Sequence, residues 1–174
     1  MDMLKQLAQK RNAVTQKWFD HMMATYPPDT SQFLRSQKDP FANPVGHNTR
    51  KNLEAIFDHL IEGFERAIVQ PLIDPIIRIR AIQDFTAGQA VRFVFDLKPI
   101  VRKSVSAKET DSKAHKALAD LDKRIDDLAL LAFDVYMQCR EKIYDLKANE
   151  MRKRIFSAFD RAGLIKEPDI GTLS

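Results

Sequence analysis

The chain has 174 residues and a net charge of +4; 44% of its residues are hydrophobic and 30% are charged. These values suit one globular domain with long solvated helices, and a glycine count of only five argues against a sheet built from many hairpins. Basic and acidic residues are interleaved along the chain, so we expect no nucleic-acid binding.

The first predicted helix runs over about 2–25, where apolar residues recur at helical spacing. The prolines in 26–28 end it, because proline lacks the backbone donor and disfavours a helical conformation in the residue before it. A short helix over 29–34 follows, capped by Asp29 or Thr30.

A loop is predicted over 36–46, because this stretch contains two prolines, an asparagine and a glycine. Phe41 and Val45 are its apolar residues, and we expect them to attach the loop to the body of the protein. A second long helix is predicted over 47–69, with an apolar stripe at helical spacing. Pro71 marks the end of this helix.

The third predicted helix begins with Asp74 as its N-cap and Pro75 at the first helical position. It stops near Thr86, which is expected to cap a fourth helix over 87–105. Pro99 lies inside that fourth helix and is expected to kink it. The polar stretch that follows is predicted to be a linker.

The last predicted helix is the longest and covers about 112–162 without proline or glycine, ending at Gly163. At 1.5 Å per residue it would be about 75 Å long, so it must protrude, break or pair with another chain. Its apolar residues repeat in steps of three and four, which indicates a heptad seam. The seam either packs within the chain or forms a dimer; its members are Leu118, Leu121, Ile125, Leu128, Ala132, Val135 and Cys139.

These elements together predict an all-α fold, a bundle of about five helices with a long C-terminal helix. We expect a single domain over 1–165 and a flexible tail over 166–174. The lone Cys139 forms no internal disulfide, which indicates a reducing cytoplasmic location. The N-terminus lacks the apolar segment of a signal peptide, and no apolar run is long enough to span a bilayer.

The clearest candidate site is the region where the loop meets the second long helix. His47 follows the turn and opens that helix, and free backbone N–H groups at a helix start bind anions. Asn48 and Arg50 lie beside it, and Phe41 and Asn43 are in the preceding loop. The alternative is that these residues only cap the helix and anchor the loop.

A second candidate group consists of Arg80, Gln83 and Asp84, polar residues among apolar ones. They could line a polar pocket that binds a ligand or partner. Alternatively, Arg80 and Asp84 are four residues apart and could form a surface salt bridge along a helix.

Motifs for catalysis are missing from the sequence, which contains no P-loop, GxGxxG, GxSxG or HExxH pattern. We therefore predict that the protein is not an enzyme and needs no cofactor or metal. A haem or metal bound by one of the four histidines is kept as an alternative.

Several stretches of the chain form a recognisable set. The most specific is the loop KDPFANPVG at 38–46, and the others are Trp18, ATYP at 24–27, Phe33 with Leu34, RAIQDF at 80–85, QAV at 89–91 and the closing helix at 149–163. Together these stretches resemble the N-terminal domain of RsbRD-type RsbT co-antagonist proteins of the bacterial stressosome. This resemblance implies a sensory input module, which in such proteins precedes a STAS output domain. It also implies a dimeric, globin-like fold without haem.

We therefore expect a non-catalytic signalling or regulatory module that works in the stress response. No STAS domain follows before Ser174, so the module is expected to act alone by binding a partner protein or small ligand and to dimerise through its long last helix. The alternative function is an accessory protein of a redox or respiratory complex.

Overall fold

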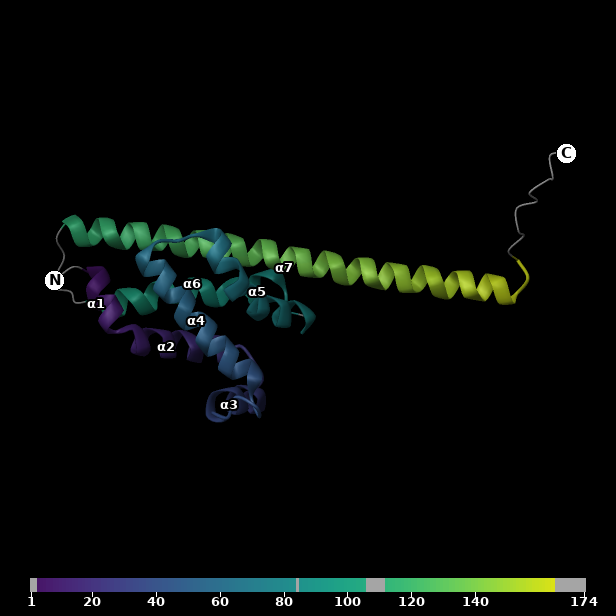
Figure 1. The fold of residues 1–174 in the computed structure, drawn as a ribbon, viewed down its shortest axis with the longest axis horizontal. Coiled ribbons are helices and arrows are strands. Elements are labelled where there is room, and N and C mark those ends of the chain that lie inside the picture. Colours follow the sequence, from purple (N-terminus) through teal and green to yellow (C-terminus); the bar gives the residue numbers. More distant parts are fainter. Residues whose placement is uncertain (1–2, 84, 106–111, 165–174) are drawn as a thin grey trace. The chain divides into compact units, whose positions relative to one another are not determined.

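The computed structural model describes residues 3–83, 85–105 and 112–164, and within them it contains only α-helices and no strand (Figure 1). The all-α prediction is confirmed, with seven helices in this part of the chain rather than about five. None of the described helices is both long and apolar enough to cross a membrane. The helices are α1 (Met3–Gln9), α2 (Arg11–Met23), α3 (Pro28–Ser36), α4 (Pro44–Glu62), α5 (Arg66–Ile82), α6 (Ala87–Ser104) and α7 (Ser112–Arg161).

The chain forms two compact units, the first over Met1–Met137 and the second over Gln138–Ser174. Helix α7 contributes its N-terminal part to the first unit and its C-terminal part to the second. The expected domain end at 165 and the tail over 166–174 lie outside the described residues and stay predictions.

The core of the first unit is centred on α2, which packs against α4 and α6. Helix α5 also packs against α4 and α6, while α1 and α3 each cover α2 and α4. Trp18 is fully buried at this centre, and its indole Nε1 donates a hydrogen bond to the Phe93 carbonyl oxygen at 2.7 Å. Burial of such apolar side chains is the main stabilising contribution to a fold of this kind.

The predicted first helix is broken at Lys10, so α1 and α2 replace a single helix over 2–25. The second long helix, predicted over 47–69, also lies elsewhere, because α4 covers Pro44–Glu62. Helix α4 begins at Pro44 because Asn43 caps it, and it ends at Glu62 because Gly63 follows with a φ of +154°. Residues with side chains rarely adopt this backbone conformation, so glycine is suited to end the helix.

The prediction that Pro71 and Asp74–Pro75 separate two helices is wrong, because α5 runs through both prolines. Pro71 and Pro75 are four residues apart, and both are exposed. The carbonyls that lose their helical donor belong to Ala67 and Pro71, which are also exposed, so water can satisfy them. The opposite face of α5 carries buried Ile73, Ile76 and Ile77 and holds the helix in the core.

The boundaries of α6 follow the prediction closely. The Thr86 hydroxyl accepts a hydrogen bond from the Gln89 N–H at 3.3 Å, and the Gln89 side chain accepts one from the Thr86 N–H at 3.0 Å. This reciprocal arrangement is a capping box, which satisfies two of the donors left free at a helix start. The polar linker predicted before α7 lies largely outside the described residues.

The predicted seam of α7 is packed inside this one chain. Leu121, Ile125, Leu128, Ala132 and Val135 are buried, Leu118 is half-buried, and Cys139 is buried and forms no disulfide. Polar contacts reinforce this packing in the first unit: Lys98 Nζ lies 2.6 Å from Asp126 Oδ1, and Arg124 Nη1 donates to the Leu60 and Ile61 carbonyls at the end of α4. The seam is therefore buried within the single chain, and its role in a dimer stays a prediction.

The loop before α4 is organised around Asn43, which is almost completely buried. Its Oδ1 accepts a hydrogen bond from the Gly46 N–H at 2.8 Å, and its Nδ2 donates to the Leu34 and Gln37 carbonyls at 3.0 Å. Gly46 is required here because a Cβ at this position would lie 2.7 Å from the Leu34 carbonyl oxygen. One side chain thus joins the end of α3 to the start of α4.

Candidate ligand-binding sites

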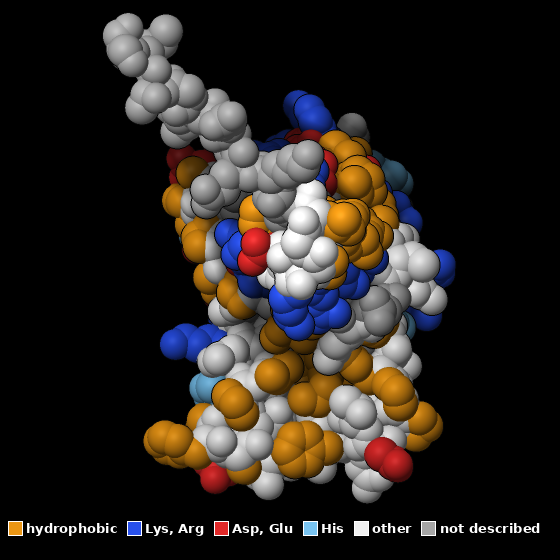
Figure 2. Space-filling view, turned by 90° about the vertical axis from the view of Figure 1, so that its right-hand side faces the viewer, with side chains coloured by type: hydrophobic (Ala, Val, Ile, Leu, Met, Phe, Trp, Pro, Cys, Tyr) orange, Lys and Arg blue, Asp and Glu red, His pale blue; other side chains and the backbone are white. Residues whose placement is uncertain are grey.

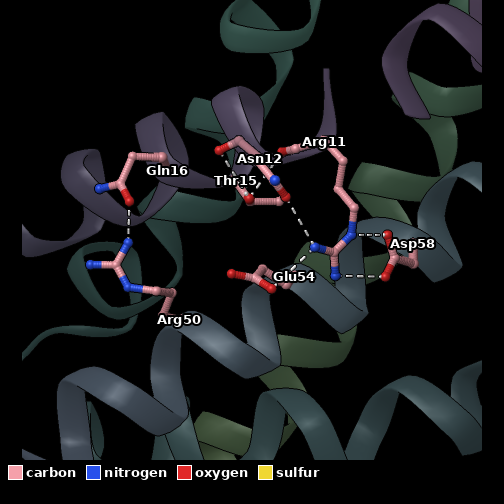
Figure 3. Close-up of polar contacts among 7 residues, drawn as sticks. All are labelled: Arg11, Asn12, Thr15, Gln16, Arg50, Glu54 and Asp58. Atoms are coloured by element: carbon pink, nitrogen blue, oxygen red, sulfur yellow. Dashed lines mark hydrogen bonds and ion pairs between the residues drawn. The ribbon is translucent and has the colours of Figure 1, made fainter. Parts of the chain in front are cut away.

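Helices α2 and α4 are joined at one end by Arg11 (Figure 3). Its Nε and Nη2 donate to the two carboxylate oxygens of Asp58 at 2.6 and 2.8 Å, and its Nη1 donates to Glu54 at 3.1 Å. The hydrogen bond to Asp58 is the largest cause that raises the pKa of Arg11, and burial opposes it. Such a two-pronged pair fixes geometry as well as charge, so this contact is structural.

Farther along the same two helices lies a pocket of about 410 Å³, which we call the basic pocket. Its volume is in the range of small-molecule sites. Four of its lining side chains are basic or imidazole groups and none is acidic. The lining residues are Gln16, Leu34, Arg35, Gln37, Lys38, Gly46, His47 and Arg50.

Arg50 is held in place at the wall of the basic pocket by neutral groups. It donates a hydrogen bond to Gln16 Oε1 (Figure 3). Its guanidinium carbon also lies 4.0 Å from the centre of the Phe19 ring. Arg35 differs, because it donates to the Asp20 carbonyl at 2.7 Å and lies 3.8 Å from the Asp20 carboxylate. In the described part of the chain no carboxylate pairs with Arg50 or Lys38, so the pocket keeps a positive charge.

The structure separates the residues that the sequence grouped around His47. His47 and Arg50 line the basic pocket, whereas Asn48 lines a different, smaller pocket of about 120 Å³ beside Pro75. The backbone N–H of His47 already donates to the Asn43 carbonyl oxygen at 3.1 Å. Any anion here would therefore be bound by side chains rather than by free N–H groups at the helix start.

The other two loop residues have different roles from each other. Asn43 is the buried cap described above, so both of its amide donors are used within the chain and its side chain is not exposed to a ligand. Phe41 is 95% exposed, so the expectation that it attaches the loop to the body is wrong. The buried Asn43 provides that attachment, and Val45 reaches the surface as well.

Arg80 is the most unusual polar residue of the structure, because it is completely buried on α5. Its Nη2 donates to the Thr25 hydroxyl at 3.0 Å and to the Gln89 carbonyl oxygen at 3.1 Å. Its Nε and Nη1 have no hydrogen-bond partner. Burial lowers the pKa of Arg80, but arginine side chains stay charged near neutral pH. The alternative of a surface salt bridge is therefore wrong for Arg80.

The two residues that the sequence grouped with Arg80 do not share its position. Gln83 is exposed and lies just after the end of α5. Asp84 lies outside the described residues, and so does its expected pairing with Arg80. Sequence patterns do not predict the partners that surround Arg80, because Tyr26 lies in the connection between α2 and α3 and Phe93 lies in α6.

The described residues contain no group of three or more histidine, cysteine, aspartate or glutamate side chains that could hold a metal ion.

On the face viewed in Figure 2, hydrophobic side chains reach the surface among lysine and arginine side chains. Among the described residues of the second unit, the exposed large hydrophobic residues are Tyr144, Leu146, Met151, Ile155, Phe156, Phe159 and Leu164.

Comparison with known proteins places this chain in one family. An uncharacterized protein of Archaeoglobus fulgidus is 27% identical over 143 residues, which cover 80% of this chain and 83% of that protein. No solved structure matches the chain significantly. The family model of the RsbT co-antagonist protein rsbRD N-terminal domain matches residues 12–151, which include the basic pocket and Arg80. The chain therefore belongs to the family of RsbRD N-terminal domains.

Proposed function

We propose that this protein is a non-catalytic input module of stress signalling that binds a small anionic ligand in the basic pocket. The observation that carries the proposal is the charge of the pocket wall, where Arg50 and Lys38 have no carboxylate partner among the described residues. Cationic side chains gathered in a concave site attract anions and strengthen their binding. Membership of the RsbRD N-terminal family supports the regulatory role.

The geometry of the pocket favours a ligand with a carboxylate or phosphate group. Arg50 lies over the Phe19 ring, and its hydrogen bond to Gln16 limits its rotation. A guanidinium held in this way loses less conformational freedom when it binds an oxyanion. Because the walls come from α2, α3 and α4, a bound ligand would favour one arrangement of these helices over others.

Calorimetric titration of the full chain with inorganic phosphate tests the proposal. The variant Arg50→Gln combined with Lys38→Gln is expected to bind at least about tenfold more weakly, since it removes both unpaired cations. The matched control is Arg92→Gln, which removes an exposed arginine of α6 that pairs with Asp96 and lies outside the pocket. Equal weakening in the control and the double variant would contradict the proposal.

Dimerisation belongs to the same proposal, and because the seam of α7 is buried within the chain, we assign the contact to exposed residues of the second unit. Within the second unit, Tyr144, Met151, Ile155 and Phe159 are exposed and are separated by steps of seven, four and four. Such steps place them on one side of a helix. We expect this apolar stripe to pair with the same stripe of a second chain.

Sedimentation or light scattering at high micromolar concentration tests the dimer. The variant Ile155→Glu should shift the protein to the monomer, because a buried carboxylate without a partner opposes association. Leu146→Glu is the control, since Leu146 is similarly exposed but lies away from the stripe. A strictly monomeric wild-type protein would refute dimerisation. The globin-like arrangement implied by the family resemblance stays a prediction.

A further inference from the structure

Arg80 lies in an enclosure formed by three aromatic rings. Its guanidinium carbon is 4.3 Å from the ring centre of Phe85, 5.4 Å from that of Tyr26 and 5.5 Å from that of Phe93. The Tyr26 and Phe85 rings meet edge to face at 5.6 Å. Aromatic faces attract a cation, so the enclosure compensates part of the loss of hydration of Arg80.

The compensation is incomplete, because hydrogen bonds use only one of the three nitrogens of the guanidinium. Both bonds of Arg80 come from Nη2, and Nε and Nη1 remain without an acceptor. Arginine has five N–H donors, and buried polar groups in native proteins nearly always have partners. Among the described residues, Arg80 has unused donors and no carboxylate partner. Its guanidinium is therefore suited to bind an anion.

We propose that Arg80 is the binding residue of a second ligand site, which takes the carboxylate or phosphate group of a small molecule. This site is distinct from the basic pocket: its residues come from α5, from α6, from the connection between them and from the connection between α2 and α3, and none of them lines that pocket. The oxyanion accepts hydrogen bonds from the free nitrogens, and the aromatic rings contact the apolar part of the ligand. Charge-assisted hydrogen bonds of this kind are among the strongest in proteins.

Access to Arg80 is provided by the residues that cover it. Thr25 and Gln89, which accept its two hydrogen bonds, are both exposed, and Phe85 is half-buried. Arg80 therefore lies only one side chain below the surface. The Phe85 ring is the nearest of the three to the guanidinium carbon, so its rotation is the entry route that the proposal assigns to the anion.

The only tryptophan of the chain reports on this site. Trp18 stacks on Phe93 with ring centres 6.1 Å apart, and Phe93 is one of the three rings around Arg80. Titration of the full chain with sodium phosphate and, separately, with sodium acetate should change the Trp18 fluorescence in a saturable way. Sodium chloride at the same ionic strength serves as the reference. The salt that saturates at the lower concentration identifies phosphate or carboxylate as the preferred group.

The variant Arg80→Met should abolish this saturable change, whereas the double variant Arg50→Gln with Lys38→Gln should retain it. The second result separates this site from the basic pocket, so each proposal can fail alone. If Arg80→Met does not fold, Arg80→Lys keeps the charge but loses the planar fork, and its affinity should fall at least about tenfold. An unchanged titration in the Arg80 variant, or no saturable change with either salt in the wild-type protein, would overturn the proposal.

Discussion

Arg11 and Arg80 are two arginines of the same unit with opposite surroundings. Arg11 lies partly exposed between α2 and α4, and Asp58 and Glu54 neutralise it with three short contacts. Arg80 is fully buried on α5, with aromatic rings and two neutral oxygen acceptors around it. Among the described residues, Arg11 has carboxylate partners for its charge and Arg80 has none.

The two arginines are therefore expected to have opposite effects on the stability of the fold. A partly exposed paired arginine contributes modestly to folding, because water competes for both partners. A buried arginine without a counter-ion opposes folding, because its hydration is lost and not fully replaced. A sequence retains such a group for a reason other than stability, and ligand binding is the reason proposed above.

The largest effect is expected when Arg80 is replaced by residues of different volume. Arg80→Ala should lower the free energy of unfolding by about 3 kcal/mol, because it leaves a cavity between the three rings. Arg80→Met fills the same space without charge and should leave stability unchanged or raise it by about 1 kcal/mol. Urea unfolding measures both variants. A large loss in Arg80→Met would show that Arg80 stabilises the fold as Arg11 does, which would remove the contrast.

Removal of Arg11 should have a smaller effect. Arg11→Met should lower the free energy of unfolding by about 1 kcal/mol, because Asp58 and Glu54 are left facing each other without a cation. The deficit should shrink in 0.5 M sodium chloride, since salt screens exposed charges. A double-mutant cycle with Asp58→Asn isolates the pair. A deficit that is independent of salt would indicate lost packing instead.

The contact that holds Phe85, one of the three rings around Arg80, should make a similar or smaller contribution to stability. The Tyr136 hydroxyl of α7 donates a hydrogen bond to the Phe85 carbonyl oxygen. Tyr136→Phe should lower the free energy of unfolding by up to about 1 kcal/mol and leave the aromatic packing in place. Hydrogen exchange should show faster opening in the connection between α5 and α6. No change in exchange would show that this bond does not hold the wall of the Arg80 enclosure.

The smallest effect is expected at the surface of the loop. Phe41→Ser should change the free energy of unfolding by less than about 0.5 kcal/mol, because Phe41 is almost fully exposed. Phosphate binding in the basic pocket should also stay the same. Urea unfolding and calorimetry provide the two measurements, and a loss larger than the Arg11→Met deficit would contradict the position of Phe41.

Much of the helical pattern could be predicted from punctuation in the sequence. The Thr86 cap, the prolines after α2 and the start of α7 are local signals, and the structure follows them. The sequence wrongly predicts a break at the prolines of α5, because the effect of a proline depends on which face of the helix is hydrated. That face is fixed by packing against other helices, which a local pattern does not reveal.

The candidate sites were predictable only in part, for the same reason. His47 and Arg50 stand close together in the sequence, so they could be grouped, but Gln16 and Lys38 reach the basic pocket through the packing of α2 and α3. Arg80 was recognised as a polar residue among apolar ones. Its burial depends on Tyr26 and Phe93, which are far from it in the sequence.

The contacts of Asn43 have a consequence for protein engineering. The side chain serves two helices at once, and Gly46 leaves the space in which it fits. Individual substitutions in this connection are therefore interdependent, because a residue that suits the end of α3 must also suit the start of α4. Grafting the connection into a related domain should succeed as one block, with Asn43 and Gly46 transferred together.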